Sequence, residues 1–208
     1  MVIHQCFISW SGEAWSLPAG SCPYPIALII RNQERSKGRM MPLINPITQP
    51  ADDGEIEAFK AWAKYPVPDD YLAFLREHNG GYLIGDDPCF YNSDDQSVAS
   101  VSAFPRISER IDKCMSKMFE KYFDFFKVAF QTEDLRGNYF APDNYIKIAN
   151  DAQHEHILMD LKTGRIFGFD DEAEEELETT EDFLEACLFL ADSFDSFFSQ
   201  IVDEDPDS

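Results

Sequence analysis

The sequence is short of basic residues. Its 17 Lys and Arg stand against 39 Asp and Glu, which gives a formal net charge of −22 over 208 residues. A chain this negative repels the phosphates of nucleic acids and the surfaces of anionic membranes, so we expect neither class of partner. Cationic partners are favoured instead, because a field of this sign can raise their association rate by roughly 10- to 1000-fold.

Long hydrophobic runs and cysteine motifs are also missing. No stretch approaches the roughly 20 apolar residues of a membrane-spanning helix, and the N-terminus lacks the basic region of a secretory signal. The five cysteines form no CxxC pair and have no zinc-finger spacing. We therefore expect reduced thiols in a cytoplasmic protein.

Catalytic signatures are absent as well: the sequence has no GxSxG, GxGxxG, HExxH or phosphate-binding loop. His154 and His156 could share one face of a strand as metal ligands, but no third ligand is evident, and the segment favours solvent-facing turn residues. We interpret His78 as stabilising the end of a helix, and Cys187, in "ACLFLA", as a core residue. The prediction is a protein that is not an enzyme, with no metal site and no cofactor.

The sequence does contain the material for a large core, since 44% of its residues are hydrophobic and 18 are Phe. Charge is unevenly spread: residues 1–40 carry a net +2 and residues 41–208 a net −24. We divide the chain into an N-terminal extension (1–40), a domain (41–202) and an acidic tail (203–208). The extension has two interpretations, an added strand or arm, or a segment upstream of a natural translation start at Met40 or Met41.

Two helices are predicted after residue 52. Asp52 or Asp53 is placed to cap the first helix, and Pro68 to begin the second. The second helix ends at three residues that tolerate a positive φ, namely Asn79, Gly80 and Gly81.

A run of short strands follows, predicted at 82–84, 89–91, 98–101, 127–130, 145–150, 156–161 and 165–169. A helix capped by Ser108 interrupts this run, and Gly164 suits the left-handed position of a tight turn. Thr179 or Thr180 caps a further helix, and Asp192 or Ser193 caps a last one that carries Phe194. Strands in succession with helices gathered at both ends predict an α+β fold with an antiparallel sheet flanked by helices.

Three ordered segments carry motifs of one known family: "VPDDYLAFLREHNGG" (67–81), "YIKIANDAQHEHILMDLKTGRIFGFDDE" (145–172) and "LADSFDSFFSQI" (190–201). Together they resemble the SUKH superfamily, which includes the fungal cell-wall-assembly regulator and many bacterial immunity proteins. The resemblance spans roughly residues 52–202 and implies a single SUKH-like domain without a shared catalytic apparatus. The corner Phe169–Glu172 departs from the Trp and His-Glu pair of many members, so no role of that histidine is carried over.

An acidic block follows this corner: nine of the thirteen residues from Asp170 to Asp182 are Asp or Glu. The block lacks the central glycine of an EF-hand calcium loop. A dense exposed run also lacks the distinct environments that catalytic carboxylate pairs need. Two interpretations stay open, a solvated, self-repelling loop and a partner-binding face.

The resemblance implies a non-catalytic protein-binding domain, in first place an immunity protein that neutralises a cognate bacterial toxin such as a nuclease. The alternative is a regulatory or scaffolding interaction protein of the cell-wall-assembly regulator type. A nuclease grips phosphates with Lys and Arg, so a basic partner is expected. We predict steering by the acidic residues Asp170, Asp171, Glu172, Glu174, Glu175 and Glu176, and anchoring by the aromatic residues Tyr82, Phe90 and Tyr91. The sequence indicates no oligomeric state.

Overall fold

The computed structural model describes residues 9–10, 13–14, 43–46, 48–84, 88–91, 97–108, 127–150, 156–169 and 177–203. Contacts divide the chain into two units, Met1–Glu34 and Arg35–Ser208. In the first unit, β1 (Ser9–Trp10) and β2 (Glu13–Ala14) form a short antiparallel hairpin. The division at Glu34 precedes the change of charge near Met40.

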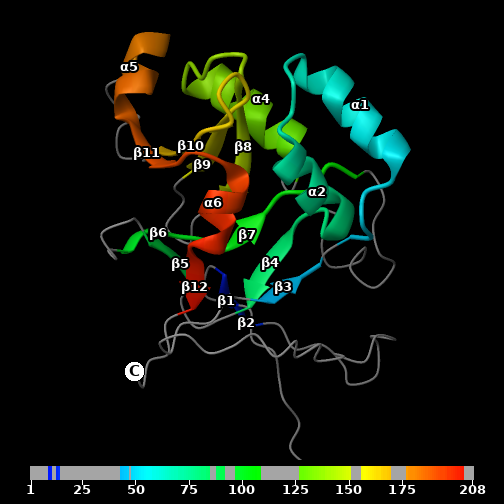
Figure 1. The fold of residues 1–208 in the computed structure, drawn as a ribbon. Helices are drawn as coiled ribbons and strands as arrows, with labels where there is room; N and C mark the ends of the chain where they lie inside the picture. The colour runs from blue at the N-terminus through cyan, green and yellow to red at the C-terminus, as the bar shows by residue number, and fades with distance from the viewer. Residues whose placement is uncertain are drawn as a thin grey trace, which may run out of the picture. The chain divides into compact units, whose positions relative to one another are not determined.

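The second unit is built on a main sheet whose described strands run in the order β11-β10-β9-β8-β7-β4-β3, with every neighbouring pair antiparallel. Figure 1 shows this sheet together with a smaller one of order β12-β5-β6. The main-sheet strands are β3 (Leu43–Asn45), β4 (Gly81–Ile84), β7 (Ala103–Phe104), β8 (Tyr145–Asn150), β9 (His156–Asp160), β10 (Ile166–Phe169) and β11 (Cys187–Ala191). The smaller sheet comprises β5 (Pro88–Tyr91), β6 (Ser97–Ser100) and β12 (Ile201–Asp203).

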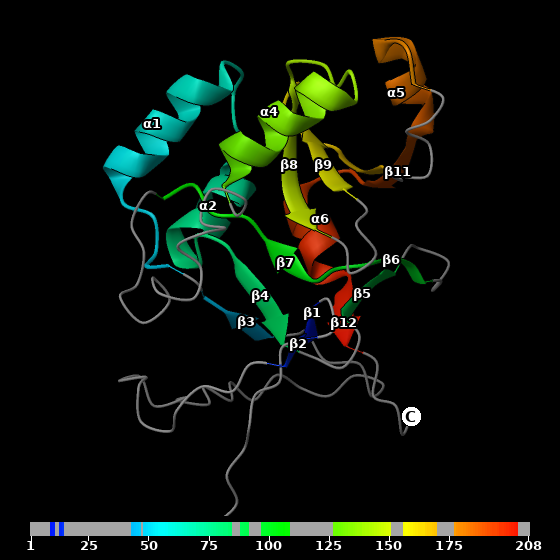
Figure 2. The ribbon, with the colours of Figure 1, turned by 180° about the vertical axis from the view of Figure 1, so that it is seen from behind.

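Helices cover both faces of the main sheet. They are α1 (Asp53–Ala63), α2 (Asp69–Glu77), α4 (Val128–Asn138), α5 (Thr180–Ala186) and α6 (Phe194–Ser199). In opposite views, α2 and α6 lie on one face and α4 on the other (Figures 1 and 2). The predicted α+β fold, an antiparallel sheet flanked by helices, is confirmed. Among the described helices, each is too short or too polar to cross a membrane.

The helix ends follow the predicted capping residues. Asp52 caps α1 by accepting the N–H of Glu55 at 2.9 Å, and the Glu55 carboxylate accepts the N–H of Asp52 at 3.0 Å. This reciprocal capping box satisfies two N–H groups that lack partners inside the helix. Thr179 caps α5 in the same way with Asp182, and the Ser193 hydroxyl caps α6 by accepting the N–H of Ser196 at 3.1 Å.

Two hydrophobic clusters lie on the two faces of the sheet. The larger joins α1, α2 and α6, and its centre is aromatic: Phe74 lies 4.9 Å from both Phe104 and Phe194 between ring centroids. The smaller cluster packs Leu135 of α4 and Phe183 of α5 against Phe169 of β10. It therefore fixes α4 and α5 at the β8–β11 end of the sheet.

The strand predicted at 127–130 is wrong, because helix α4 begins at Val128, directly after its N-cap Lys127. Val128, Thr132 and Leu135 are buried at helical spacing, whereas the short apolar start "KVAF" resembles a strand when considered alone. The predicted core run "ACLFLA" instead contains the edge strand β11, and residues 201–203 form a strand that we did not predict. The predicted helix after Ser108 lies outside the described residues.

Candidate protein-binding surface

The six acidic residues predicted to steer a partner, between Asp170 and Glu176, lie outside the described residues, so their role stays a prediction. The two described residues that flank them are informative. Phe169 is paired with Cys187, the first residue of β11, and Leu177 packs against the smaller core cluster. Both ends of the acidic segment are thus attached beside α5 and β11.

The three predicted aromatic anchors are less exposed than a partner-binding role requires. Phe90 is fully buried, with its ring 5.2 Å from that of Phe197, and Tyr91 is buried as well. Tyr82 is half-buried, and desolvation raises the pKa of its phenol. Strand β5 carries Phe90 and Tyr91 between β6 and the unpredicted β12, which explains their burial. We therefore assign Phe90 and Tyr91 to the core and no longer to contact with a partner.

The Asn79-Gly80-Gly81 motif connects α2 to the sheet. The buried Asn79 amide donates to the Gln49 carbonyl at 3.0 Å and accepts the Ile107 N–H at 3.1 Å. Gly80 and Gly81 have φ values of 84° and 145°, which L-residues rarely adopt. These hydrogen bonds and φ values give the motif a structural role, which is to connect α2 to β4.

Two other residues named from sequence have local structural surroundings. Gly164, with φ 77°, forms the β9–β10 turn, where Asp160 accepts its N–H at 2.7 Å. Phe194, the first residue of α6 after its Ser193 cap, is buried in the larger core cluster.

His78, His156 and Cys187, the candidates that the structure describes, are not gathered into a metal site. His156 is buried, not solvent-facing as expected, because it begins β9; its Nδ1 lies 2.6 Å from Lys147 Nζ. His154 lies outside the described residues, within which no group of three or more His, Cys, Asp or Glu is placed to hold a metal. Burial lowers the pKa of His78, which opposes the cationic form that we assigned to it. Burial raises the pKa of Cys187 to about 12, which opposes a reactive thiolate.

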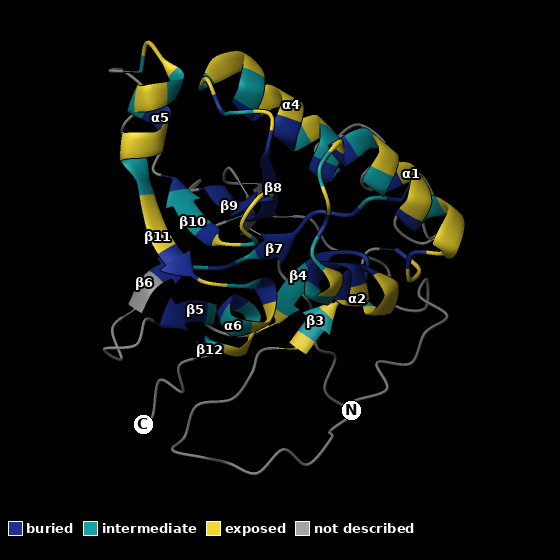
Figure 3. Cartoon of the chain, turned by 45° about the horizontal axis from the view of Figure 1, so that its top comes forward, coloured by how far each residue is buried: buried dark blue, intermediate teal, exposed yellow. Residues whose placement is uncertain are grey.

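Large exposed apolar side chains mark a different surface, which the sequence did not indicate. Leu184, Leu188 and Phe189, here called the β11 patch, are 42%, 55% and 49% exposed. Figure 3 shows exposed colouring over α5 and the first part of β11. These three residues lie on α5 and on the edge strand β11, with Leu188 and Phe189 on opposite faces of the sheet, so they mark a candidate interaction edge. Four further exposed apolar residues lie elsewhere in the described chain, namely Leu43, Ile84, Phe130 and Phe140.

Phe189 is held in place by its neighbours on the sheet. Its ring meets that of Phe167 edge-on at 5.9 Å, and the guanidinium carbon of Arg165 lies 5.8 Å from its centroid. Arg165 is itself oriented by Asp192, whose carboxylate lies 3.3 Å from Arg165 Nε. These contacts pack one side of the Phe189 ring, and the residue is 49% exposed.

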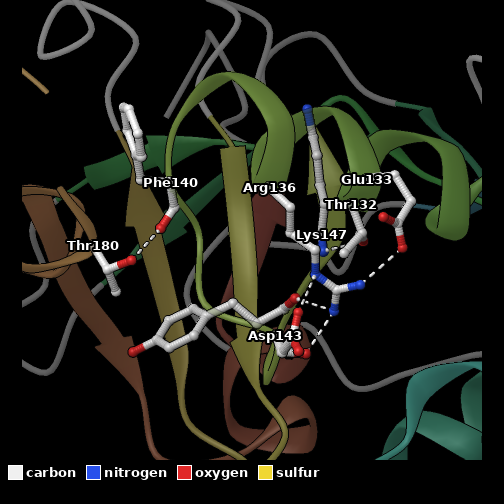
Figure 4. A network of polar contacts seen from close by, with 8 residues as sticks. Thr132, Glu133, Arg136, Phe140, Asp143, Lys147 and Thr180 are labelled. Carbon is white, nitrogen blue, oxygen red and sulfur yellow. Dashed lines mark hydrogen bonds and ion pairs between the residues drawn. The ribbon is translucent and has the colours of Figure 1, made fainter. Parts of the chain in front are cut away.

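Polar contacts fasten α4 and the start of α5 to their neighbours (Figure 4). Arg136 of α4 bonds Glu133 at 2.9 Å and donates to the Asp143 carbonyl at 2.6 Å, and the Thr132 hydroxyl of α4 accepts the Lys147 N–H of β8 at 3.0 Å. Thr180, the first residue of α5, donates its hydroxyl to the Phe140 carbonyl at 3.0 Å. These bonds fix α4 on β8 and the start of α5 beside α4.

The surroundings of the β11 patch are acidic. Exposed carboxylates on or beside α5 and β11 belong to Glu178, Glu181, Glu185 and Asp192. No Lys, Arg or His follows Arg165 in the sequence. The surface therefore combines exposed apolar side chains with exposed carboxylates, beside the cation Arg165.

The model of the SMI1 / KNR4 family (SUKH-1) matches residues 50–200. The matched region contains all five described helices and the whole β11 patch. A search of curated proteins finds no significant match.

Proposed function

Because the chain belongs to the SMI1 / KNR4 family (SUKH-1), we propose that it is a non-catalytic, cytoplasmic immunity protein that neutralises a toxin by binding it directly. The family match over residues 50–200 is the observation that carries this proposal. It supports an interaction or immunity-type domain in general. The charge and the surface of this chain support the more specific proposal of an immunity protein that binds a basic toxin.

The charge supports a basic partner. A nuclease toxin binds phosphates through Lys and Arg, so its active face is positive. A protein with net charge −22 attracts such a face and can cover it. In this proposal the acidic residues between Asp170 and Glu176 accelerate the encounter, and apolar side chains such as Phe189 hold the complex once it has formed.

Coexpression with the product of a neighbouring toxin-like gene tests the proposal. We expect the chain to restore growth and to form a stable complex with the toxin. Absence of both rescue and complex formation would refute it.

The steering role has its own test. Replacing the six acidic residues from Asp170 to Glu176 by Asn or Gln should slow association and weaken its salt dependence between about 50 and 500 mM. The matched control neutralises six exposed acidic residues elsewhere: Asp53, Glu57, Glu77, Glu133, Asp134 and Asp143. Equal slowing by both variants would show that only total charge matters, whereas an unchanged rate in the first variant would rule out steering by this segment.

The family also favours a second candidate, a regulatory or scaffolding protein of the cell-wall-assembly regulator type. Such a protein is expected to bind several unrelated partners without protecting cells from a toxin. Growth rescue by the chain therefore distinguishes the two candidates.

A further inference from the structure

We propose that the partner adds an extended basic segment to the open edge of β11, as a further antiparallel or parallel strand of the main sheet. The inference rests on the proposed function only in taking a basic protein as the partner.

Within the described part of the chain, β11 is an edge strand whose own residues give it little protection. Among the described strands it has a neighbour on one side only, β10. Folded proteins normally block such edges with charged residues, proline or bulges, because unpaired N–H and C=O groups pair with other strands. "CLFLA" contains no charge and no proline, and the register shift opposite Ile166/Phe167 leaves residues 187–189 in regular pairing.

The register identifies the outward-facing backbone groups. In the β9–β10 hairpin the Asp160 N–H donates to the Arg165 carbonyl at 2.9 Å. Because bonding direction alternates along an antiparallel strand, Phe167 and Phe169 then bond to β9, and Gly168 bonds towards β11. Gly168 is paired with Leu188. Leu188 therefore directs its N–H and C=O inward, and Cys187 and Phe189 direct theirs outward.

Apolar side chains flank this edge on both faces of the sheet. Successive side chains point to opposite faces, so Leu188 lies on one face and Phe189 on the other, and they are 55% and 49% exposed. An added strand would bond to the outward groups of Cys187 and Phe189 and cover both exposed side chains. Backbone bonds give affinity in this mode of recognition, and side-chain contacts give specificity.

Charge selects a basic segment over a second copy of this chain. Exposed Glu181 and Glu185 lie on α5, which leads directly into β11, whereas Asp192, which follows the strand, is already paired with Arg165. Joining two copies at β11 would bring these carboxylates and two net charges of −22 together. A partner strand that alternates Lys or Arg with apolar residues instead satisfies both the carboxylates and the exposed apolar side chains.

Amide hydrogen exchange of the full chain tests the pairing. The probe is an acetylated, amidated heptapeptide that alternates Lys and Val. At saturating peptide we expect exchange at Cys187 and Phe189 to slow by about tenfold or more, and exchange at Leu188 to change by less than about twofold. A peptide alternating Glu and Val should leave all three rates unchanged. Unchanged rates at Cys187 and Phe189 with millimolar Lys peptide would overturn the proposal.

A matched pair of variants distinguishes peptide binding at β11 from binding at the opposite edge strand, β3. Phe189→Lys on β11 and Leu43→Lys on the opposite edge strand β3 each replace a side chain that is about half exposed, so both should fold. We expect the first to weaken binding of the Lys peptide by about tenfold and the second by less than about twofold. Equal weakening, or none, contradicts docking at β11.

Two further outcomes are decisive. If the chain alone sediments as a dimer that Phe189→Lys dissociates, a second copy occupies the edge and the basic segment is wrong. If the chain protects cells from the toxin but Phe189→Lys protects equally well, the edge proposal fails and the proposed function stands. If the Lys peptide binds at β11 but the chain does not protect cells from the toxin, the edge proposal stands and the proposed function fails.

Discussion

Replacement of Gly80 by Ala should destabilise the second unit substantially. Gly80 follows α2 with φ 84°, where an L-residue costs about 1–2 kcal/mol. An added Cβ would lie 2.8 Å from the Phe104 carbonyl oxygen and 2.9 Å from the Arg106 nitrogen. Both atoms belong to backbone, which cannot move aside cheaply, so overpacking adds about 1–3 kcal/mol. We expect the free energy of unfolding to fall by about 2–5 kcal/mol.

Gly137→Ala provides the control, since it makes the same chemical change without the strain. Gly137 lies in α4, and apart from its chain neighbours and the backbone of its own helix, no heavy atom lies within 4 Å of the position of an added Cβ. Helix propensity should stabilise this variant by up to about 1 kcal/mol. Urea unfolding followed by far-ultraviolet circular dichroism compares the two, and the melting temperature of Gly80→Ala should fall by at least about 5 °C. If Gly80→Ala unfolds at the same urea concentration as Gly137→Ala, the assignment of the motif to backbone geometry is refuted.

Three further predictions concern single side chains. Asn79→Ala removes two hydrogen bonds of a buried amide, so the free energy of unfolding, measured by urea unfolding, should fall by about 2–3 kcal/mol. The control Asn138→Ala replaces an exposed amide and should change it by less than about 0.5 kcal/mol. The Thr179 hydroxyl and the Glu178 and Thr179 N–H groups lower the pKa of Asp182 below 3.8, so its contribution to stability is present above the unfolded pKa and is lost as the pH falls through the folded pKa. Asp182→Asn should therefore lose less stability than wild type between about pH 5 and pH 2, and equal losses would contradict this cap. Burial raises the pKa of the Cys187 thiol to about 12. At pH 8 this thiol should therefore react with iodoacetamide at least about tenfold more slowly in the folded chain than in urea, as measured by peptide mass spectrometry. Equal rates would show that the thiol is not buried.

The sequence predicted those parts of the fold that depend on local chemistry. Asp52, Thr179 and Ser193 cap their helices because an oxygen-bearing side chain precedes each helical stretch. Gly164 occupies its turn because few other residues adopt φ 77°. The order of strands and helices predicted the fold class, and the resemblance of three ordered segments indicated the family that the match over residues 50–200 shows.

What the sequence could not predict depends on long-range pairing. "ACLFLA" is apolar enough for a core strand, and only its position at the end of the strand order leaves Leu188 and Phe189 exposed. Burial of Phe90 follows from the sheet order β12-β5-β6, which joins segments more than a hundred residues apart. A local pattern carries no information about either arrangement.

The most direct test of the proposed function is calorimetric titration of the purified chain into the product of a neighbouring toxin-like gene, with the activity of that product measured in the same samples. The account predicts a one-to-one complex and loss of toxin activity in proportion to the complex formed. Heat of binding without inhibition, or a toxin that stays active and unbound at micromolar concentrations of the chain, would contradict it.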